Sequence, residues 1–233
     1  MNAIQQENVD VHFTPAQSIT EDGVVGADGI KREIDAIVCA TGFDVSFKPR
    51  FPVIGRNGVN LQDKWADAAE GYFGITCADM PNWITFIGPN WPVAAGSIMG
   101  GLDANTDYAI EMIRKLQDET VKSVCPSQKA QDEFNEHTQT WAVGTVWNAN
   151  CRSWYKDVVT GRLRAVYPGS TLHFLDMISR VRWEDYDIEH EHKNRFAFMG
   201  VGRHMAQTSA RDEEGLDASP YTQLEKVDMR CFK

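Results

Sequence analysis

Two apolar runs of strand length, each followed by a turn-forming sequence, constrain the fold of this chain more than any other feature. Residues 34–40 read Ile-Asp-Ala-Ile-Val-Cys-Ala and are followed by Thr41-Gly42, and residues 83–87 read Trp-Ile-Thr-Phe-Ile and are followed by Gly88-Pro89-Asn90. A short apolar run that ends in a sharp turn is typical of a buried strand in a sheet with covered faces. We therefore predict buried strands over 34–40 and 83–87.

Amphipathic periodicity predicts three main helices after these runs. They cover residues 97–116, 126–147 and 170–181. Ser97 and Ser170 begin the first and third ranges, and serine caps helix N-termini because its hydroxyl accepts an otherwise unpaired backbone N–H. Pro126 and Ser127 begin the second, since proline is tolerated in the first turn of a helix. The sequence therefore predicts helices and strands in one fold.

Shorter strands complete this prediction. Alternating residues predict a strand over 9–13, closely spaced glycines over 23–29 predict the turns of a β-meander, and apolar residues predict late strands over 162–167 and 194–199. Frequent Pro and Gly over 43–82 predict irregular structure with short elements. The expected fold is α+β, derived from α/β, in a single domain over 1–205 with an irregular tail over 206–233.

Composition excludes several classes of partner. The 233 residues carry 33 acidic and 23 basic side chains, and a net charge of -10 argues against nucleic acid and anionic membrane surfaces. Five cysteines without a C-x-x-C pair indicate neither a disulfide framework nor a zinc knuckle, and they fit a reducing compartment. Without a secretion signal or an apolar stretch of about 18 residues, we predict a cytoplasmic protein with no membrane span.

Three local patterns have both a chemical and a plain structural interpretation. Gly200-Val201-Gly202 begins like a dinucleotide-binding turn, but Met205 stands where the third glycine belongs, so we predict an ordinary turn. His190 and His192 have a spacing used by metal sites, but they lie in a charged stretch that we expect to be solvated. Cys151 next to an arginine is expected to be a packed small residue. We predict no metal site and no cofactor-binding turn.

Three motifs in fixed order carry a resemblance to a known family. They are Ala40-Thr41-Gly42-Phe43-Asp44 after the first strand, Gly88-Pro89-Asn90 after the second, and Cys151-Arg-Ser-Trp-Tyr155 followed by Tyr167-Pro-Gly-Ser170. Together they resemble the C-terminal portion of flavin-dependent class B monooxygenases, above all the fungal Baeyer–Villiger enzymes that act on polyketide or terpenoid ketones. The resemblance extends to Gly200 and implies an incomplete remnant of the FAD-binding domain of a two-dinucleotide-domain enzyme.

The same resemblance implies a substrate pocket. In such enzymes the segment after Gly-Pro runs beside the flavin, and the Trp of the Ser-Trp-Tyr stretch lies near nicotinamide and substrate. The implied substrate-binding residues are Asn90, Trp91, Pro92, Val93, Ser97 and Trp154. Family members also carry GxGxxG turns for FAD and NADPH and a fingerprint with a His between them, and none of these occurs in this sequence.

Two residues are candidate acids or bases. His173 lies in the first turn of the third predicted helix between apolar neighbours, where burial favours a neutral imidazole. Asp44 follows a strand end, where ligands bind α/β sheets. His173 also has a structural interpretation, as a histidine whose hydrogen bonds are satisfied within the fold.

Three functions remain open at this stage. The initial Met and the sustained patterning favour a separate short gene product that works without a cofactor, as a cyclase, isomerase or lyase on an apolar polyketide- or terpenoid-type ketone in fungal secondary metabolism. The alternatives are the C-terminal part of an FAD- and NADPH-dependent Baeyer–Villiger monooxygenase and a non-catalytic binding protein. Surfaces without their family neighbours predict a homo-oligomer that buries at least about 1,000 Å² in total.

Overall fold

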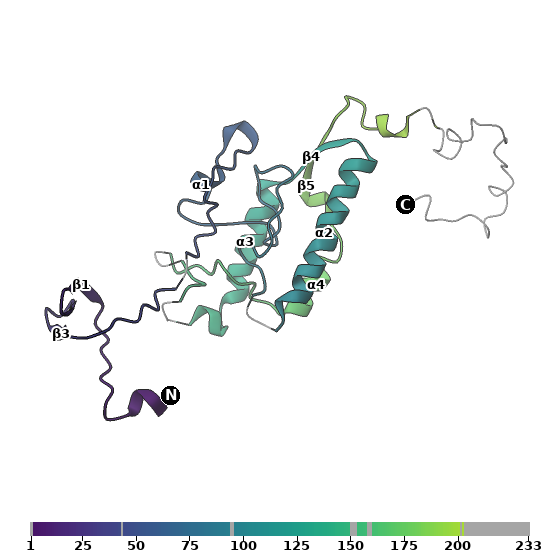
Figure 1. Cartoon of the computed structure of the whole chain (residues 1–233). Coiled ribbons are helices and arrows are strands. Elements are labelled where there is room, and N and C mark those ends of the chain that lie inside the picture. Colours follow the sequence, from purple (N-terminus) through teal and green to yellow (C-terminus); the bar gives the residue numbers. More distant parts are fainter. Residues whose placement is uncertain are drawn as a thin grey trace, which may run out of the picture. The chain divides into compact units, whose positions relative to one another are not determined.

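The chain divides into two compact units. The computed structural model describes residues 2–42, 44–93, 96–149, 153–157, 160–200 and 202. The first unit ends at Asp44 and the second begins at Val45, whereas the sequence predicted one domain over 1–205. The predicted tail over 206–233 lies outside the described residues. Figure 1 shows both units, coloured along the sequence.

The first unit is a small β-meander. Strands β1 (Ala16–Thr20), β2 (Gly23–Gly26) and β3 (Lys31–Glu33) pair antiparallel in the order β1-β2-β3, as the glycine spacing predicted. Gly29 turns the chain between β2 and β3 with φ 75°, a conformation that costs glycine little because it has no Cβ. The strand predicted over 9–13 is wrong, since those residues are mostly exposed and pair with no strand. They are preceded by a short 3₁₀ turn, η1 (Asn2–Gln5).

The buried strand predicted over 34–40 is also wrong for this structure. The segment forms no strand, all of its residues are exposed, and Val38 is 91% exposed. An apolar run becomes a buried strand only where neighbouring strands and covering layers exist on both sides. The first unit offers a three-stranded meander of short strands and no helix longer than one turn. Segment 34–40 therefore has the amino-acid composition of a buried strand, although all of its residues are exposed to solvent.

The second unit begins with irregular structure, as predicted. Between Val45 and Val93 it contains the short 3₁₀ turn η2 (Arg56–Gly58) and the single-turn helix α1 (Leu61–Lys64), which Asn60 caps through Gln62 N–H. These turns enclose a small core of their own. Its buried members are Leu61, Trp65, Ala69, Cys77 and Met80.

The second predicted strand, over 83–87, is wrong for a local reason. Asn82 and Ile87, just before and at the end of this run, adopt left-handed backbone conformations, with φ 58° and 57°. Inside the run, the N–H of Thr85 donates to the carbonyl of Ile75 at 2.6 Å. Its hydrogen-bond partner therefore belongs to a turn and not to a neighbouring strand. Gly88 then approaches the same turn so closely that a Cβ there would lie 2.5 Å from the carbonyl oxygen of Gly74. The apolar side chains of the run are mostly half-buried.

The three predicted helices are confirmed. They are α2 (Ile98–Asp118), α3 (Gln128–Ala142) and α4 (Thr171–Met177), and Figure 1 shows α4 beside α2. Each begins after a capping serine, whose hydroxyl accepts a backbone N–H of the first turn: Ser97 from Met99, Ser127 from Ala130 and Ser170 from His173. Pro126, expected in the first turn of the second helix, is instead the last residue of a strand. The second and third helices end earlier than predicted. Further short 3₁₀ turns are η3 (Val146–Asn148) and η4 (Trp183–Asp185).

The sheet of the second unit is one that the sequence did not predict. Strands β4 (Val121–Pro126) and β5 (Tyr186–His190) pair antiparallel, although 184–193 was expected to be a solvated stretch. The strand predicted over 162–167 is reduced to an isolated bridge between Lys156 and Leu163. The strand predicted over 194–199 is wrong, since this exposed segment contains the 3₁₀ turn η5 (Ala197–Met199).

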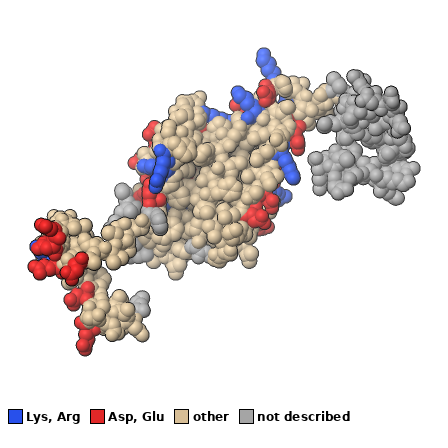
Figure 2. All heavy atoms as spheres, viewed as in Figure 1, with Lys and Arg blue, Asp and Glu red and all other residues tan. Residues whose placement is uncertain are grey.

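The main core of the second unit lies where α2, α4, β4 and β5 meet the segment before α2. Its buried aromatic and aliphatic members include Tyr72, Phe73, Ile75, Trp91, Tyr108, Met112, Val124, Tyr167, Phe174 and Ile178. Figure 2 shows acidic side chains gathered on the first unit, whereas the visible face of the second unit is largely uncharged. Among the described helices, none has both the length and the apolar character needed to cross a membrane.

Candidate functional site

The segment expected to line a substrate pocket begins with a buried, tightly held turn. Asn90 has φ 63° and is 2% exposed, and its N–H donates to the carbonyl of Arg164 at 2.7 Å. Its side-chain amide donates to the Asn135 side chain of α3 at 2.9 Å, and Asn135 in turn donates to Gly71 at 2.9 Å. Through these hydrogen bonds Asn90 holds its turn against both α3 and the backbone at Arg164.

Trp91 packs inside the second unit. Its side chain is fully buried, its indole N–H donates to Asn105 of α2 at 3.3 Å, and its ring meets Phe174 edge to face at 5.8 Å. A Cβ at Gly101 would lie 2.5 Å from this ring, so a glycine is needed there for α2 to pack on it. In this structure Trp91 is a core side chain. Pro92 is buried as well and Val93 half-buried, and their role in substrate binding stays a prediction.

Ser97 marks an exposed helix start. Its hydroxyl caps α2, and the next residues, Ile98 and Met99, are 38% and 68% exposed. The first backbone N–H groups of a long helix carry partial positive charge and favour an anion or an electron-rich ligand edge. Ala94 and Ala95, between Val93 and Gly96, lie outside the described residues.

The structure gives the two acid–base candidates different surroundings. His173 is half-buried on α4, and its Nδ1 is 2.7 Å from the hydroxyl of Tyr167, with the Trp141 ring edge-on at 5.1 Å. Asp44 is exposed at the end of the first unit, whereas His173 belongs to the second. The hydrogen bond explains why a histidine fits its position without catalysis, and the catalytic role of both residues stays a prediction.

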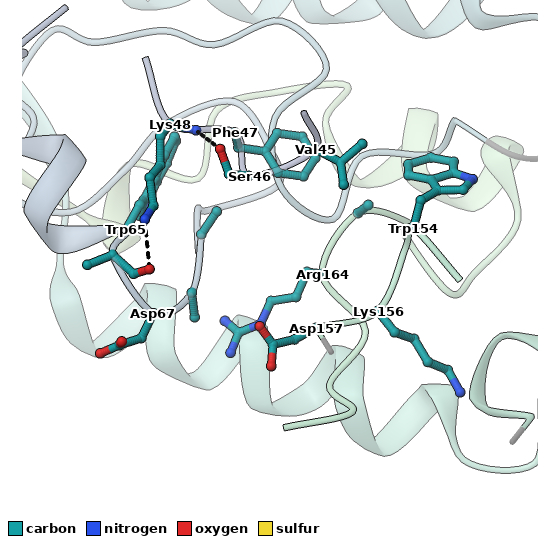
Figure 3. Close-up of a pocket in the computed structure, with 14 residues that line it drawn as sticks. Val45, Ser46, Phe47, Lys48, Trp65, Asp67, Trp154, Lys156, Asp157 and Arg164 are labelled. Atoms are coloured by element: carbon teal, nitrogen blue, oxygen red, sulfur yellow. Dashed lines mark hydrogen bonds between the residues drawn. The ribbon is translucent and has the colours of Figure 1, made fainter. Parts of the chain in front are cut away.

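A pocket in the second unit contains one of the predicted site residues, Trp154. It has a volume of about 270 Å³, and its lining comes from four segments, 45–48, 65–69, 154–157 and 164–165. Figure 3 shows Phe47 and Trp154 along one side, with Arg164 and Asp157 together below them. The other predicted site residues do not line it. The pocket therefore brings together Trp154 and polar residues that sequence reasoning did not single out.

Arg164 is a largely buried charge in the lining of this pocket. Its side chain is 13% exposed, and its Nη1 pairs with Oε1 of Glu70 at 2.9 Å. Burial lowers the pKa of this guanidinium, and the nearby Glu70 carboxylate partly opposes that effect. Arg162 reaches the same carboxylate oxygen at 3.7 Å from a more exposed position. In the sequence, the Arg-Leu-Arg alternation over 162–164 is the signal that places these two arginines on one face.

The remaining candidates of the sequence do not form a site. Among the described residues, no cluster of three or more His, Cys, Asp or Glu side chains has the geometry to hold a metal ion. Cys151 lies outside the described residues, as does Val201 of the Gly-Val-Gly turn. Before that turn the chain forms η5 and not a strand, so it lacks the strand–turn arrangement of a dinucleotide site.

The fold resembles that of solved monooxygenases. The structure is similar to that of cyclohexanone monooxygenase from Rhodococcus sp. Phi1 bound to NADP+, with a TM-score of 0.65 and 23% identity over 79% of this chain and 36% of that one. It is also similar to that of oxidized steroid monooxygenase bound to NADP, with a TM-score of 0.58 and 22% identity. At these identities the likeness establishes the fold, which is that of a partial monooxygenase domain.

Sequence relatives then identify the family, although no protein-family model matches the chain. The FAD-binding monooxygenases moxY of Dothistroma septosporum and stcW of Emericella nidulans are 48% and 49% identical over the whole chain, which spans 37% and 38% of their lengths. A Baeyer-Villiger monooxygenase of Streptomyces coelicolor is 32% identical over 93% of the chain and 41% of its own length. The chain is a homologue of the FAD-binding and Baeyer–Villiger monooxygenases and corresponds to a C-terminal portion of them.

Proposed function

We propose that this chain supplies the C-terminal part of a flavin-dependent Baeyer–Villiger-type monooxygenase active site. The observation that carries the proposal is the 48–49% identity to two FAD-binding monooxygenases over every part of the chain. The exposure of segment 34–40 supports it. A run with the composition of a core strand gains free energy when a neighbouring sheet covers it, at about 25 cal/mol per Å² of apolar surface.

The described residues fit one end of an FAD molecule. The exposed start of α2 at Ser97 offers backbone N–H groups to the edge of a flavin ring, while Ile98 and Met99 offer apolar surface next to it. No glycine-rich turn between a strand and a helix, which would hold the pyrophosphate, occurs in the part of the chain that the structure describes. FAD, when bound, supplies the oxygen activation of such an enzyme. The fit therefore requires a second protein segment that holds the rest of the cofactor.

Complementation tests this proposal. The chain is expressed alone and together with the segment of stcW that precedes the matched region. Flavin absorbance of the purified protein and NADPH oxidation with cyclohexanone are then measured. We expect a colourless chain alone and a yellow complex with one flavin per pair. A pair that assembles without flavin would contradict the proposal.

A second candidate function is the cofactor-independent one. It is favoured by the pocket around Arg164, whose lining comes entirely from the second unit and whose guanidinium can hydrogen-bond an enolate oxygen. Here the chain acts alone as a cyclase, isomerase or lyase on a polyketide- or terpenoid-type ketone. Turnover by the flavin-free chain would support it. Neither His173 nor Asp44 lines this pocket, so their predicted acid–base role is tested separately. If it is correct, His173→Ala or Asp44→Asn should lower turnover by about 10²–10⁴-fold. Unchanged turnover in both variants would refute the acid–base assignment.

A further inference from the structure

The turn η2 contains the Asn-Gly sequence of this chain, Asn57-Gly58. Both residues have positive φ, 55° for Asn57 and 78° for Gly58, and the N–H of Val59 donates to the carbonyl of Arg56 at 3.1 Å. Two successive residues with positive φ, closed by such a bond, are typical of a type I′ turn, for which Asn-Gly is a preferred sequence. The turn therefore explains why glycine follows asparagine here.

The side chain of Asn57 is open to chemical attack. Asn57 and Gly58 are both exposed, and the carboxamide of Asn57 has no hydrogen-bond partner among the described residues. Gly58 has no side chain to crowd its backbone nitrogen. Asn60, three residues further on, is held instead, since its Oδ1 accepts the N–H of Gln62 at 3.2 Å and caps α1. Within this turn, Asn57 is therefore the asparagine with a free carboxamide.

The backbone nitrogen of the next residue is the nucleophile for such a carboxamide. The nitrogen of Gly58 loses its proton to hydroxide and bonds to Cγ of Asn57, and the bond from Cγ to Nδ2 breaks. Ammonia leaves with a proton from water, and a five-membered cyclic imide remains. Water then adds to one imide carbonyl and breaks its bond to nitrogen. Opening at the side-chain carbonyl gives an aspartate, and opening at the main-chain carbonyl gives an isoaspartate.

The folded turn slows this reaction but does not prevent it. Ring closure needs Cβ of Asn57 and the nitrogen of Gly58 on the same side of the bond between Cα and the carbonyl carbon. The ψ of 22° at Asn57 holds them on opposite sides, so the turn has to open locally before the ring can close. Exposed turns open with free energies far below that of global unfolding, and glycine adopts the opened conformations readily.

The isoaspartate product fits this turn less well than asparagine. It adds a methylene to the main chain inside the loop that the bond between Val59 and Arg56 closes. The N–H of Arg56 also donates to the carbonyl of Asp79 at 2.8 Å, and its guanidinium pairs with Asp187 of β5 at 3.4 Å. A new carboxylate at position 57 competes with Asp187 for that guanidinium. The modification should therefore loosen the turn from the two segments that Arg56 contacts.

We propose that Asn57 is a modification site at which the folded chain deamidates spontaneously, and that the isoaspartate product loosens turn η2 from Asp79 and Asp187. Water is the only co-reactant. The inference is independent of the proposed function, because neither a flavin nor a ketone takes part.

Incubation of the purified chain in mildly alkaline buffer tests the reaction, with peptide mapping by mass spectrometry under acidic conditions. We expect Asn57 to be converted first, with ammonia released in step. Asn148 is the internal control, since it is exposed but followed by alanine, and it should react at least about tenfold more slowly because only glycine leaves the attacking nitrogen uncrowded. Conversion of Asn148 before Asn57 overturns the proposal.

Two variants locate the reaction at this pair of residues. Asn57→Gln should abolish the conversion at position 57. Gly58→Ala should slow it about tenfold, although alanine is strained at φ 78° and so favours opening of the turn. A Cβ at Gly58 meets no atom within 4 Å, so the variant introduces no clash. A rate unchanged in Gly58→Ala overturns the assignment of its nitrogen as the nucleophile.

Hydrogen exchange tests the structural consequence. The isoaspartate form is separated by chromatography, and exchange of the Arg56 and Val59 amides is compared with that in the parent. We expect exchange about tenfold faster, because both amides lose their acceptors when the turn loosens. Asn57→Asp is the matched control, since it adds the carboxylate but keeps the length of the main chain, and its exchange should stay within about twofold of the parent. Equal exchange in the isoaspartate form and the parent overturns the loosening of the turn.

Discussion

The two units differ in how they use apolar and polar side chains. In the first unit, the apolar side chains of Phe13, Ile19 and Val38 are 97%, 68% and 91% exposed. The meander carries two ion pairs at its surface, Lys31–Asp22 and Arg32–Asp28. In the second unit, large aromatic side chains are buried, and polar groups pair inside the core. The first unit thus forms a sheet but leaves its large apolar side chains exposed. The second unit buries many apolar side chains, although its sheet has two strands.

The buried tyrosine hydroxyls of the second unit are an example of polar groups that pair inside its core. The hydroxyl of Tyr186 lies 2.9 Å from that of Tyr108 and 2.9 Å from that of Thr76, so α2, β5 and the turn over 72–76 are joined by hydrogen bonds. Burial raises the pKa of Tyr186 to about 12. Ion pairs at the surface stabilise little, whereas satisfied polar groups in a core fix one arrangement of the elements. The comparison predicts that substitutions in the second unit lower the free energy of unfolding more than matched substitutions in the first.

The largest effect is expected from Phe174→Ala. This side chain is fully buried on α4 and contacts the rings of Trp91 and Tyr167, with centroids 5.8 and 5.2 Å away. The substitution should lower the free energy of unfolding by about 3–5 kcal/mol, measured by urea denaturation. The matched change in the first unit, Ile19→Ala on β1, should cost less than about 0.5 kcal/mol. Similar losses in both variants would break the comparison.

The next largest effect is expected from two neighbouring glycines on α2, whose replacement by alanine should change the stability of the fold in opposite directions. Gly101→Ala places a Cβ 2.5 Å from the buried ring of Trp91 and should destabilise by about 1–3 kcal/mol. Gly100→Ala meets no atom within 4 Å and should stabilise by about 0.5 kcal/mol, because alanine is the better helix former. Thermal unfolding of the two variants measures both. Destabilisation by Gly100→Ala would show that the start of α2 is packed.

Self-association tests the exposed segment 34–40. We expect the isolated chain to form oligomers through this surface, and Val38→Lys should weaken association about tenfold, which corresponds to about 1.4 kcal/mol. Ile4→Lys, at a side chain 55% exposed in η1, serves as the control and should change association little. Light scattering over a range of concentrations measures both. A chain that stays monomeric at every concentration would contradict the prediction.

The smallest effect is a pH dependence confined to the meander. The hydrogen bond from Arg32 lowers the pKa of Asp28 from 3.8 to about 2. Because the folded pKa lies below the unfolded value, the stabilisation is complete above pH 4 or so and is lost as the pH falls towards about 2. Amide NMR signals of β2 and β3 should follow this change in the parent and not in Asp28→Asn. Glu21→Gln, outside the pair, should keep the parent's profile.

Part of the candidate site could be predicted from the sequence. The order of the motifs gave the family. Trp154 lines a pocket of the second unit, and its role in substrate binding stays a prediction. Trp91 was expected at a pocket wall and is instead in the core, since only the path of α2 past Gly101 decides which way that ring faces. Arg164 was missed, because its significance depends on Glu70, which lies 94 residues earlier in the chain.

The sequence by itself determined the local features of this protein. Helix starts at Ser97, Ser127 and Ser170 and the turn at Gly29 follow from interactions within a few residues, so pattern and capping suffice to place them. The tertiary structure alone decided which apolar segments are buried. Segment 34–40 and Trp91 have similar hydrophobic character, yet one is exposed and the other is not. The physical reason is that burial requires partners distant in the chain, and no local pattern encodes whether those partners are present.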